Sequence, residues 1–86
     1  MDIAVELSLY PLDQDRVPRI KDFIGRLHGV EGVRVITNSL STQVVGPFEL
    51  VFAALEREIR TTFEHVDKSV VVMKVIGPLT DAGLIK

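Results

Sequence analysis

Two amphipathic helical segments, each set between strand-like segments, constrain the fold of this 86-residue chain most strongly. Residues 3–10 alternate between apolar and other side chains, which is the period-two pattern of a half-buried strand. Apolar residues recur at three-to-four spacing over 17–27 and again over 48–66, which predicts two helices that each need one face covered. Further strands are predicted at 32–37, 40–45 and 69–76.

Prolines, glycines and short polar residues mark the predicted boundaries, because they remove backbone donors, cap helices or favour turns. His28-Gly29 is expected to close the first helix, with Gly29 accepting a positive φ. The other predicted boundaries are Pro11 at the end of the first strand, helix caps at Asp13-Gln14-Asp15, a tight turn at Asn38-Ser39, a break at Gly46-Pro47 with Pro47 opening the second helix, and a stop at Gly77-Pro78.

The resulting order is β-α-β-β-α-β. With right-handed crossovers, this order predicts an α+β fold of the ferredoxin-like type, a four-stranded antiparallel sheet with both helices on one face. Residues 1–78 are expected to form a single domain and 79–86 a C-terminal tail. The near-continuous apolar run over 69–76 predicts that the last strand is buried on both faces.

Composition narrows the classes of function. The chain has no cysteine, which excludes disulfides, thiolate metal sites and cysteine nucleophiles. Its net charge of −2 and pI of about 5.6 argue against a nucleic-acid partner, because such binding depends on basic side chains that neutralise phosphates. The start of the chain lacks signal-peptide features and no apolar run reaches membrane-span length, so a cytoplasmic location without membrane association is expected.

The segment 38–46 is polar where an ordinary core strand would be apolar. Successive strand residues point to opposite faces, so Ser41 and Gln43 should share one face and Leu40, Thr42 and Val44 the other. Uncharged hydrogen-bonding groups in a row suit a neutral polar heterocycle better than a phosphate, a metal or a nucleic-acid backbone. The segment therefore indicates a small-molecule site on the sheet.

The sheet face away from the helices must meet solvent, a ligand or another subunit. Several branched aliphatic side chains are predicted on it, which favours a homo-oligomer, dimer or tetramer, assembled through this open face. The residues predicted there are Ala4, Glu6, Ser8, Tyr10, Ile36, Ser41, Gln43, Val45, Val70, Val72, Lys74 and Ile76.

The polar members of the open face allow two interpretations each. Glu6 and Lys74 lie on neighbouring strands, so they either form a cross-strand ion pair or hold a ligand, Glu6 accepting from an amine. Ser8, Ser41, Thr42 and Gln43 either satisfy one another and buried waters or contact the ligand. Tyr10 either stacks on an aromatic ring or packs with its hydroxyl in water.

Other chemistry lacks support in the sequence. His28 and His65 fall near the ends of different helices, with no partner at metal-ligand spacing, so both are expected at the surface. There is no nucleophile elbow and no glycine-rich phosphate loop, so neither catalysis nor a cofactor is expected. Charged residues on the helices are expected to form solvated faces.

The sequence resembles the YkoF-like proteins, which bind thiamin or its hydroxymethylpyrimidine moiety and belong to a wider set of small thiamin-binding proteins. The resemblance runs from Ile3 to Ile76, and its specific parts are Ser8-Leu9-Tyr10-Pro11-Leu12, 38–44 and Gly46 before the long second helix. It implies ferredoxin-like domains that associate through their sheets and bind a pyrimidine without known catalysis. The ligand-binding residues that it implies are Ser8, Tyr10, Asn38, Ser41, Thr42 and Gln43. Glu6 and Lys74 are added as candidates because they are predicted on the same open face of the sheet.

The leading hypothesis is therefore a cytoplasmic, oligomeric, non-enzymatic protein that binds thiamin or hydroxymethylpyrimidine, as a carrier or salvage component. The alternative is a structural or regulatory oligomerisation module whose polar face is an interface. An enzyme ranks third, because no competent nucleophile or acid–base pair is evident.

Overall fold

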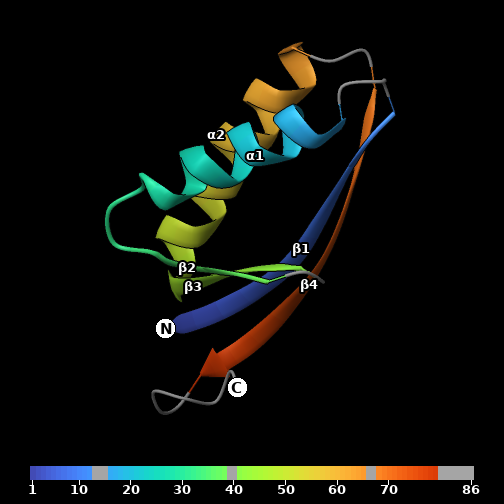
Figure 1. Cartoon of the computed structure of the whole chain (residues 1–86). Helices are drawn as coiled ribbons and strands as arrows, with labels where there is room; N and C mark the ends of the chain where they lie inside the picture. The colour runs from blue at the N-terminus through green and yellow to red at the C-terminus, as the bar shows by residue number, and fades with distance from the viewer. Residues whose placement is uncertain (13–15, 39–40, 66–67, 80–86) are drawn as a thin grey trace.

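The computed structural model describes residues 1–12, 16–38, 41–65 and 68–79 (Figure 1). Its strands form one antiparallel sheet in the order β2-β3-β1-β4. This order and the two helices confirm the ferredoxin-like α+β prediction. The elements are β1 (Asp2–Pro11), α1 (Arg16–His28), β2 (Arg34–Thr37), β3 (Thr42–Pro47), α2 (Phe48–His65) and β4 (Ser69–Leu79).

The core lies between the sheet and the two helices, which cover the same face (Figure 1). One side of β1 forms its floor, because the period-two pattern sends alternate apolar side chains toward the helices. Neither described helix is long and apolar enough to cross a membrane. The buried side chains of this core are Ile3, Val5, Leu7, Leu9, Phe23, Leu27, Val44, Val51 and Leu55.

Two predicted strand ends were wrong: β3 includes Pro47, so α2 begins at Phe48 and not at Pro47, and β4 continues through Pro78. Pro47 pairs with Asp2, beyond the point where β2 stops contacting β3, so its missing N–H removes no bond between those strands. The Gly77–Pro78 peptide bond is cis, and β4 extends to Leu79. There the register with β1 shifts by one residue, as in a β-bulge, and proline is tolerated on an edge strand.

The prediction that β4 is buried on both faces was also wrong. Its large apolar side chains from Val70 to Ile76, other than Val71, are between 43% and 51% exposed. The reason is topological, since β4 pairs only with β1 and forms an edge of the sheet. An apolar strand pattern alone does not distinguish a central strand from an uncovered edge.

The turn after α1 differs in one detail from the prediction. Gly29 closes the helix, its N–H donating to the carbonyl of Arg26 at 3.1 Å, but among the described glycines it is Gly32 that has a positive φ, of 88°. A Cβ at Gly32 would lie 2.7 Å from Cδ1 of Leu50. The caps predicted at Asp13-Gln14-Asp15 lie outside the described residues.

An ion-pair cluster around the buried Glu58 joins the two helices, which corrects the expectation that the helix charges are all solvated. Arg26 Nε donates to Glu58 Oε1 at 2.7 Å, and Arg57 Nε donates to Glu58 Oε2 at 3.0 Å. Arg26 Nη2 also donates to Thr62 Oγ1 at 2.7 Å. Burial tends to raise the pKa of Glu58, but the hydrogen bonds and positive charges of Arg57 and Arg26 outweigh it, so the pKa is lowered overall.

The residues of α2 that are buried do not coincide with its apolar stripe. Glu58 and Thr62 are buried on the side that meets α1, whereas Phe63, at the far end of the stripe, is 49% exposed. Phe48 is also exposed, and its ring lies 4.9 Å from that of Phe52, centroid to centroid. Part of the apolar stripe of α2 is thus left without a partner.

Candidate functional site

A row of residues crosses the open face of the sheet at the level of Glu6. In the strand register, Glu6 on β1 pairs with Gln43 on β3 and with Lys74 on β4, and Gln43 pairs with Ile36 on β2. Directly opposed residues of an antiparallel sheet share a face, so these four side chains lie on the face opposite the helices. The register therefore places Glu6, Gln43 and Lys74 in one line.

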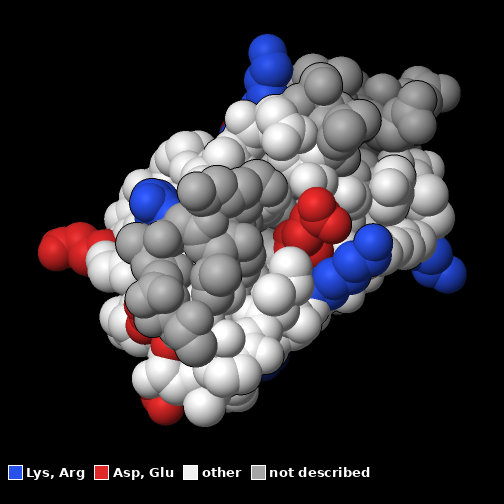
Figure 2. All heavy atoms as spheres, turned by 90° about the horizontal axis from the view of Figure 1, so that it is seen from below, with Lys and Arg blue, Asp and Glu red and all other residues white. Residues whose placement is uncertain are grey.

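Next to this row lies a hollow with a volume of about 270 Å³. Figure 2 shows the molecule from below, with acidic and basic atoms side by side near the middle of the view. We call this hollow the open-face pocket. It is lined by Glu6, Ser8, Tyr10, Ser41, Val72 and Lys74. Its residues come from β1, from β4 and from Ser41, just before β3.

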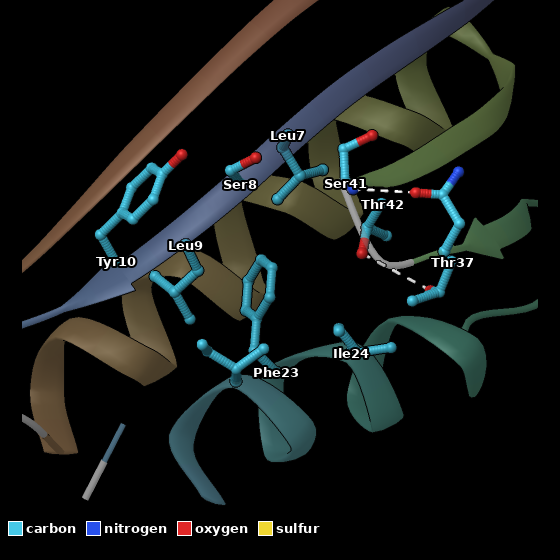
Figure 3. Close-up of a pocket in the computed structure, with 11 residues that line it drawn as sticks. Leu7, Ser8, Leu9, Tyr10, Phe23, Ile24, Thr37, Ser41 and Thr42 are labelled. Atoms are coloured by element: carbon cyan, nitrogen blue, oxygen red, sulfur yellow. Dashed lines mark hydrogen bonds between the residues drawn. The ribbon is translucent and has the colours of Figure 1, made fainter. Parts of the chain in front are cut away.

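The loop before β3 fixes one wall of the open-face pocket. The backbone N–H of Ser41 donates to Asn38 Oδ1 at 3.0 Å (Figure 3), and the backbone N–H of Asn38 donates to the carbonyl of Ser41 at 3.1 Å. The Ser41 hydroxyl donates to Glu6 Oε2 at 3.3 Å. Asn38 and Ser41 are therefore bonded to each other twice, and Ser41 is also bonded to the Glu6 carboxylate.

Glu6 and Lys74 face each other across the strands but form no ion pair within 4.0 Å. The structure thus does not realise the cross-strand ion pair that the sequence allowed. The pocket presents an acceptor carboxylate and a donor ammonium separately, together with hydroxyl groups from Ser8 and Ser41. Tyr10, 53% exposed, adds an aromatic ring at the rim.

A second hollow, of about 200 Å³, lies at the same end of the sheet but on the helix side (Figure 3). Thr42 borders it and is buried, pairing in register with Leu7, and its hydroxyl lies 3.5 Å from that of Thr37. Figure 3 shows Leu7 and Leu9 directed toward Phe23 of α1, while Ser8 and Tyr10 point the other way.

The predicted site residues are spread over both hollows, and Ser8, Tyr10 and Ser41 border the two of them. Asn38 and Thr42 border only the helix-side hollow, and Gln43 lies beside Glu6 in the register but lines neither. Leu40, predicted on the helix side, lies outside the described residues. The residues that the open-face pocket brings together are Glu6, Ser8, Tyr10, Ser41 and Lys74.

Sequence reasoning missed one lining residue, Val72, because it was read only as an apolar member of the open face. Its register position opposite Ser8 was the signal that could have placed it there. Among the described residues, no three His, Asp or Glu side chains gather closely enough to hold a metal ion. His65 contacts its own helix, Nδ1 lying 2.7 Å from the carbonyl oxygen of Thr61.

Comparisons with known proteins reveal likeness of structure. No protein-family model and no curated protein matches the chain. Protein SP2199 from Streptococcus pneumoniae superposes with a TM-score of 0.84 at 21% identity, over 99% of this chain and 93% of that one. Hypothetical protein MJ1052 from Methanocaldococcus jannascii superposes with a TM-score of 0.81 at 21% identity, over 98% of this chain and 88% of that one.

A third similar structure is a protein from Thermotoga maritima that is provisionally assigned to thiamine biosynthesis or salvage. It superposes with a TM-score of 0.69 at 17% identity, over 91% of this chain and 85% of that one. At such identities the likeness establishes a common fold. The chain thus shares its fold, over nearly its whole length, with small proteins from bacteria and an archaeon.

Proposed function

We propose that this protein binds thiamin or its hydroxymethylpyrimidine moiety in the open-face pocket, without catalysis, as a cytoplasmic carrier or salvage component. The observation that carries the proposal is the convergence of Glu6, Ser41 and Lys74 on one hollow of about 270 Å³. Small-ligand sites combine a concave surface with a few placed polar groups, and this hollow has both.

The groups around the pocket suit an aminopyrimidine. Its exocyclic amine is a donor that matches the Glu6 carboxylate, and its ring nitrogens are acceptors that match hydroxyl or ammonium donors such as Ser8 and Lys74. The exposed ring of Tyr10 can cover one face of the heterocycle. The Ser41 hydroxyl, bound to Glu6, orients the carboxylate for this contact.

Two likenesses support the choice of ligand class. The Thermotoga maritima protein with the same fold is provisionally assigned to thiamine biosynthesis or salvage. The Ser8–Leu12 and 38–44 segments resemble those of the YkoF-like thiamin-binding proteins. Both likenesses point to the same heterocycle that the donor and acceptor pattern of the pocket favours.

The test is calorimetric titration with thiamin and, in parallel, with hydroxymethylpyrimidine. Binding at micromolar concentration, weakened at least tenfold by Glu6→Gln and by Ser41→Ala, is the expected result. Thr61→Ala is the matched control, because its hydroxyl bonds only within α2, to the carbonyl of Arg57. No heat and no thermal shift at millimolar ligand would exclude this function.

The alternative function is an oligomerisation module assembled through the open face. The observation that favours it is the exposure of Ile36, Val70 and Ile76 on that face beside the polar row. Ile36→Lys, at the β2 side, would then dissociate a sheet-to-sheet assembly. A pocket function instead predicts that Ser41→Ala changes ligand affinity and leaves the assembly as it was.

A further inference from the structure

The two edge strands of the sheet, β2 and β4, differ in length and in composition. β2 is a four-residue edge, whereas β4 is an eleven-residue edge that is apolar on both faces. The outer side of an edge strand carries backbone donors and acceptors without partners, and natural proteins usually keep such edges short, charged or covered. β4 carries one charged residue, Lys74, and its proline lies near its end, at Pro78. Its length and composition are those of a strand that pairs with another.

An apolar groove runs beside this edge on the helix side. It has a volume of about 590 Å³, with Met73 of β4 on one wall and α2 on the other. The apolar residues of α2 in it are Phe52, Leu55, Ile59 and Phe63, and the charged residues Glu56, Arg60 and Glu64 line it as well. Contiguous exposed apolar surface of this kind marks an interaction site.

We propose that two copies of this chain pair antiparallel through β4, about a two-fold axis at Met73, and that the α2 grooves of the two copies meet across the seam. The occupant is a second copy because β4 is complementary to itself. Closed two-fold contacts bring the same patch of each subunit together, and directly opposed residues must lie on the same sheet face.

The register of the two β4 strands is chosen by two criteria: the length of strand that can pair, and the separation of the two Lys74 charges. An axis at Met73 pairs Ser69 with Gly77 at the limits of the overlap and leaves Pro78 outside it. An axis one residue further along would place Lys74 against Lys74 of the partner subunit, and directly opposed like charges are destabilising. The pairs formed about Met73 are Val71 with Val75, Val70 with Ile76, and Val72 with Lys74.

The apolar groove adds buried interface area to that covered by the pairing of the two β4 strands. A standard stable interface covers about 800 Å² on each partner, which is about one seventh of the 5683 Å² surface of this chain. Strand pairing covers the outer edge of β4, and the meeting of two grooves covers Ile59, Phe63 and Met73. Apolar side chains exposed in one copy thus become the centre of the interface.

The pairing also changes the open-face pocket. Val72 and Lys74 line it from β4, at the side that faces the sheet edge. In the register about Met73, Lys74 of the partner subunit lies beside Val72, so each pocket gains a second ammonium group at its wall. This consequence rests on the proposed function, whereas the pairing of β4 does not.

Single cysteines test the register directly, because the chain contains none. Met73→Cys lies on the axis, so mild oxidation should convert most of the protein to a covalent dimer. Val70→Cys is the matched control, with nearly the same exposure as Met73, but its copies would lie about 20 Å apart at about 3.3 Å per residue. Its homodimer yield should be less than one tenth as large. An equimolar mixture of Val70→Cys and Ile76→Cys should instead give the mixed disulfide.

Sedimentation equilibrium of the unmodified chain completes the test. A dimer that Met73→Lys weakens at least tenfold, with the circular dichroism of the fold unchanged, supports the pairing. A monomer at 100 µM, equal cross-linking of Met73→Cys and Val70→Cys, or no mixed disulfide would overturn it. None of these measurements uses a ligand, so failure of thiamin binding would leave their result intact.

Discussion

Glu6 and Lys74 stand directly opposite each other on β1 and β4, yet the Glu6 carboxylate accepts its hydrogen bond from the Ser41 hydroxyl, at 3.3 Å, and forms no ion pair with Lys74 within 4.0 Å. The carboxylate is thus held toward the loop before β3, and the ammonium lies apart from it in the same pocket. Opposite charges that do not satisfy each other are available to a third group.

Replacing Lys74 therefore separates binding from stability. Lys74→Met keeps the length of an exposed side chain and removes its charge, so urea unfolding should change by less than about 0.5 kcal/mol. The affinity for thiamin or hydroxymethylpyrimidine should fall, because a donor is lost from the pocket. Destabilisation by more than about 1 kcal/mol would instead show that Lys74 has a structural partner.

The Glu58 cluster predicts a specific response to acid. Because the folded-state pKa of Glu58 lies below its ordinary value of 4.5, its charge contributes stability that is complete above that value and is lost as the pH falls through the folded-state pKa. Glu58→Gln should lower the unfolding free energy at pH 7 by about 1–3 kcal/mol, since Arg26 loses its charged partner. It should also flatten the pH dependence below about pH 4.5. Urea unfolding at several pH values between 3 and 7 measures both effects.

Glu56→Gln is the control for that prediction. Glu56 pairs with Arg60 at 3.1 Å on the exposed side of the same helix, and a surface pair of this kind contributes little to stability. If Glu56→Gln and Glu58→Gln gave equal losses and equal pH profiles, the special role of the interhelical cluster would be refuted.

Two glycines predict changes of opposite sign. Gly32→Ala should destabilise the fold by about 1–2 kcal/mol, because Gly32 has a φ of 88° and a Cβ there would lie 2.7 Å from Leu50 Cδ1. Gly25→Ala should stabilise it by about 0.5–1 kcal/mol, because Gly25 lies within α1 and a Cβ there meets nothing within 4 Å. Thermal and urea unfolding of both variants give the comparison, and equal shifts for the two would contradict it.

The sequence predicted the element order and the faces of the strands, because these depend on local periodicity. The alternation over residues 3–10 placed Glu6 and Ser8 on the open face, where the structure has them. Strand limits at Pro47 and Pro78 were wrong, because the effect of a proline depends on whether a neighbouring strand still needs its N–H.

Other features depend on contacts between distant segments and leave no local signal. In the sequence, Glu58 is indistinguishable from the other charged residues of an amphipathic helix. Its partner Arg26 lies 32 residues away in sequence, on α1, and only the fold brings the two into contact. The exposure of β4 likewise follows from its place at the sheet edge. The alternation of strand side chains predicted which residues share the open face, but the position of Ser41 in the pocket also depends on its hydrogen bond to Asn38.

Thr42 and Glu6 separate the two hollows, because each borders only one of them. Thr42 is buried on the helix side, whereas Glu6 lines the open-face pocket and accepts a hydrogen bond from the Ser41 hydroxyl. Thr42→Val keeps the shape of the side chain and should leave thiamin or hydroxymethylpyrimidine affinity within twofold, with a loss of stability of about 1 kcal/mol for the missing hydroxyl contact. Glu6→Gln should weaken binding at least tenfold with little loss of stability. Calorimetric titration of both variants decides the location of the ligand, since stronger weakening by Thr42→Val would move the site to the helix-side hollow.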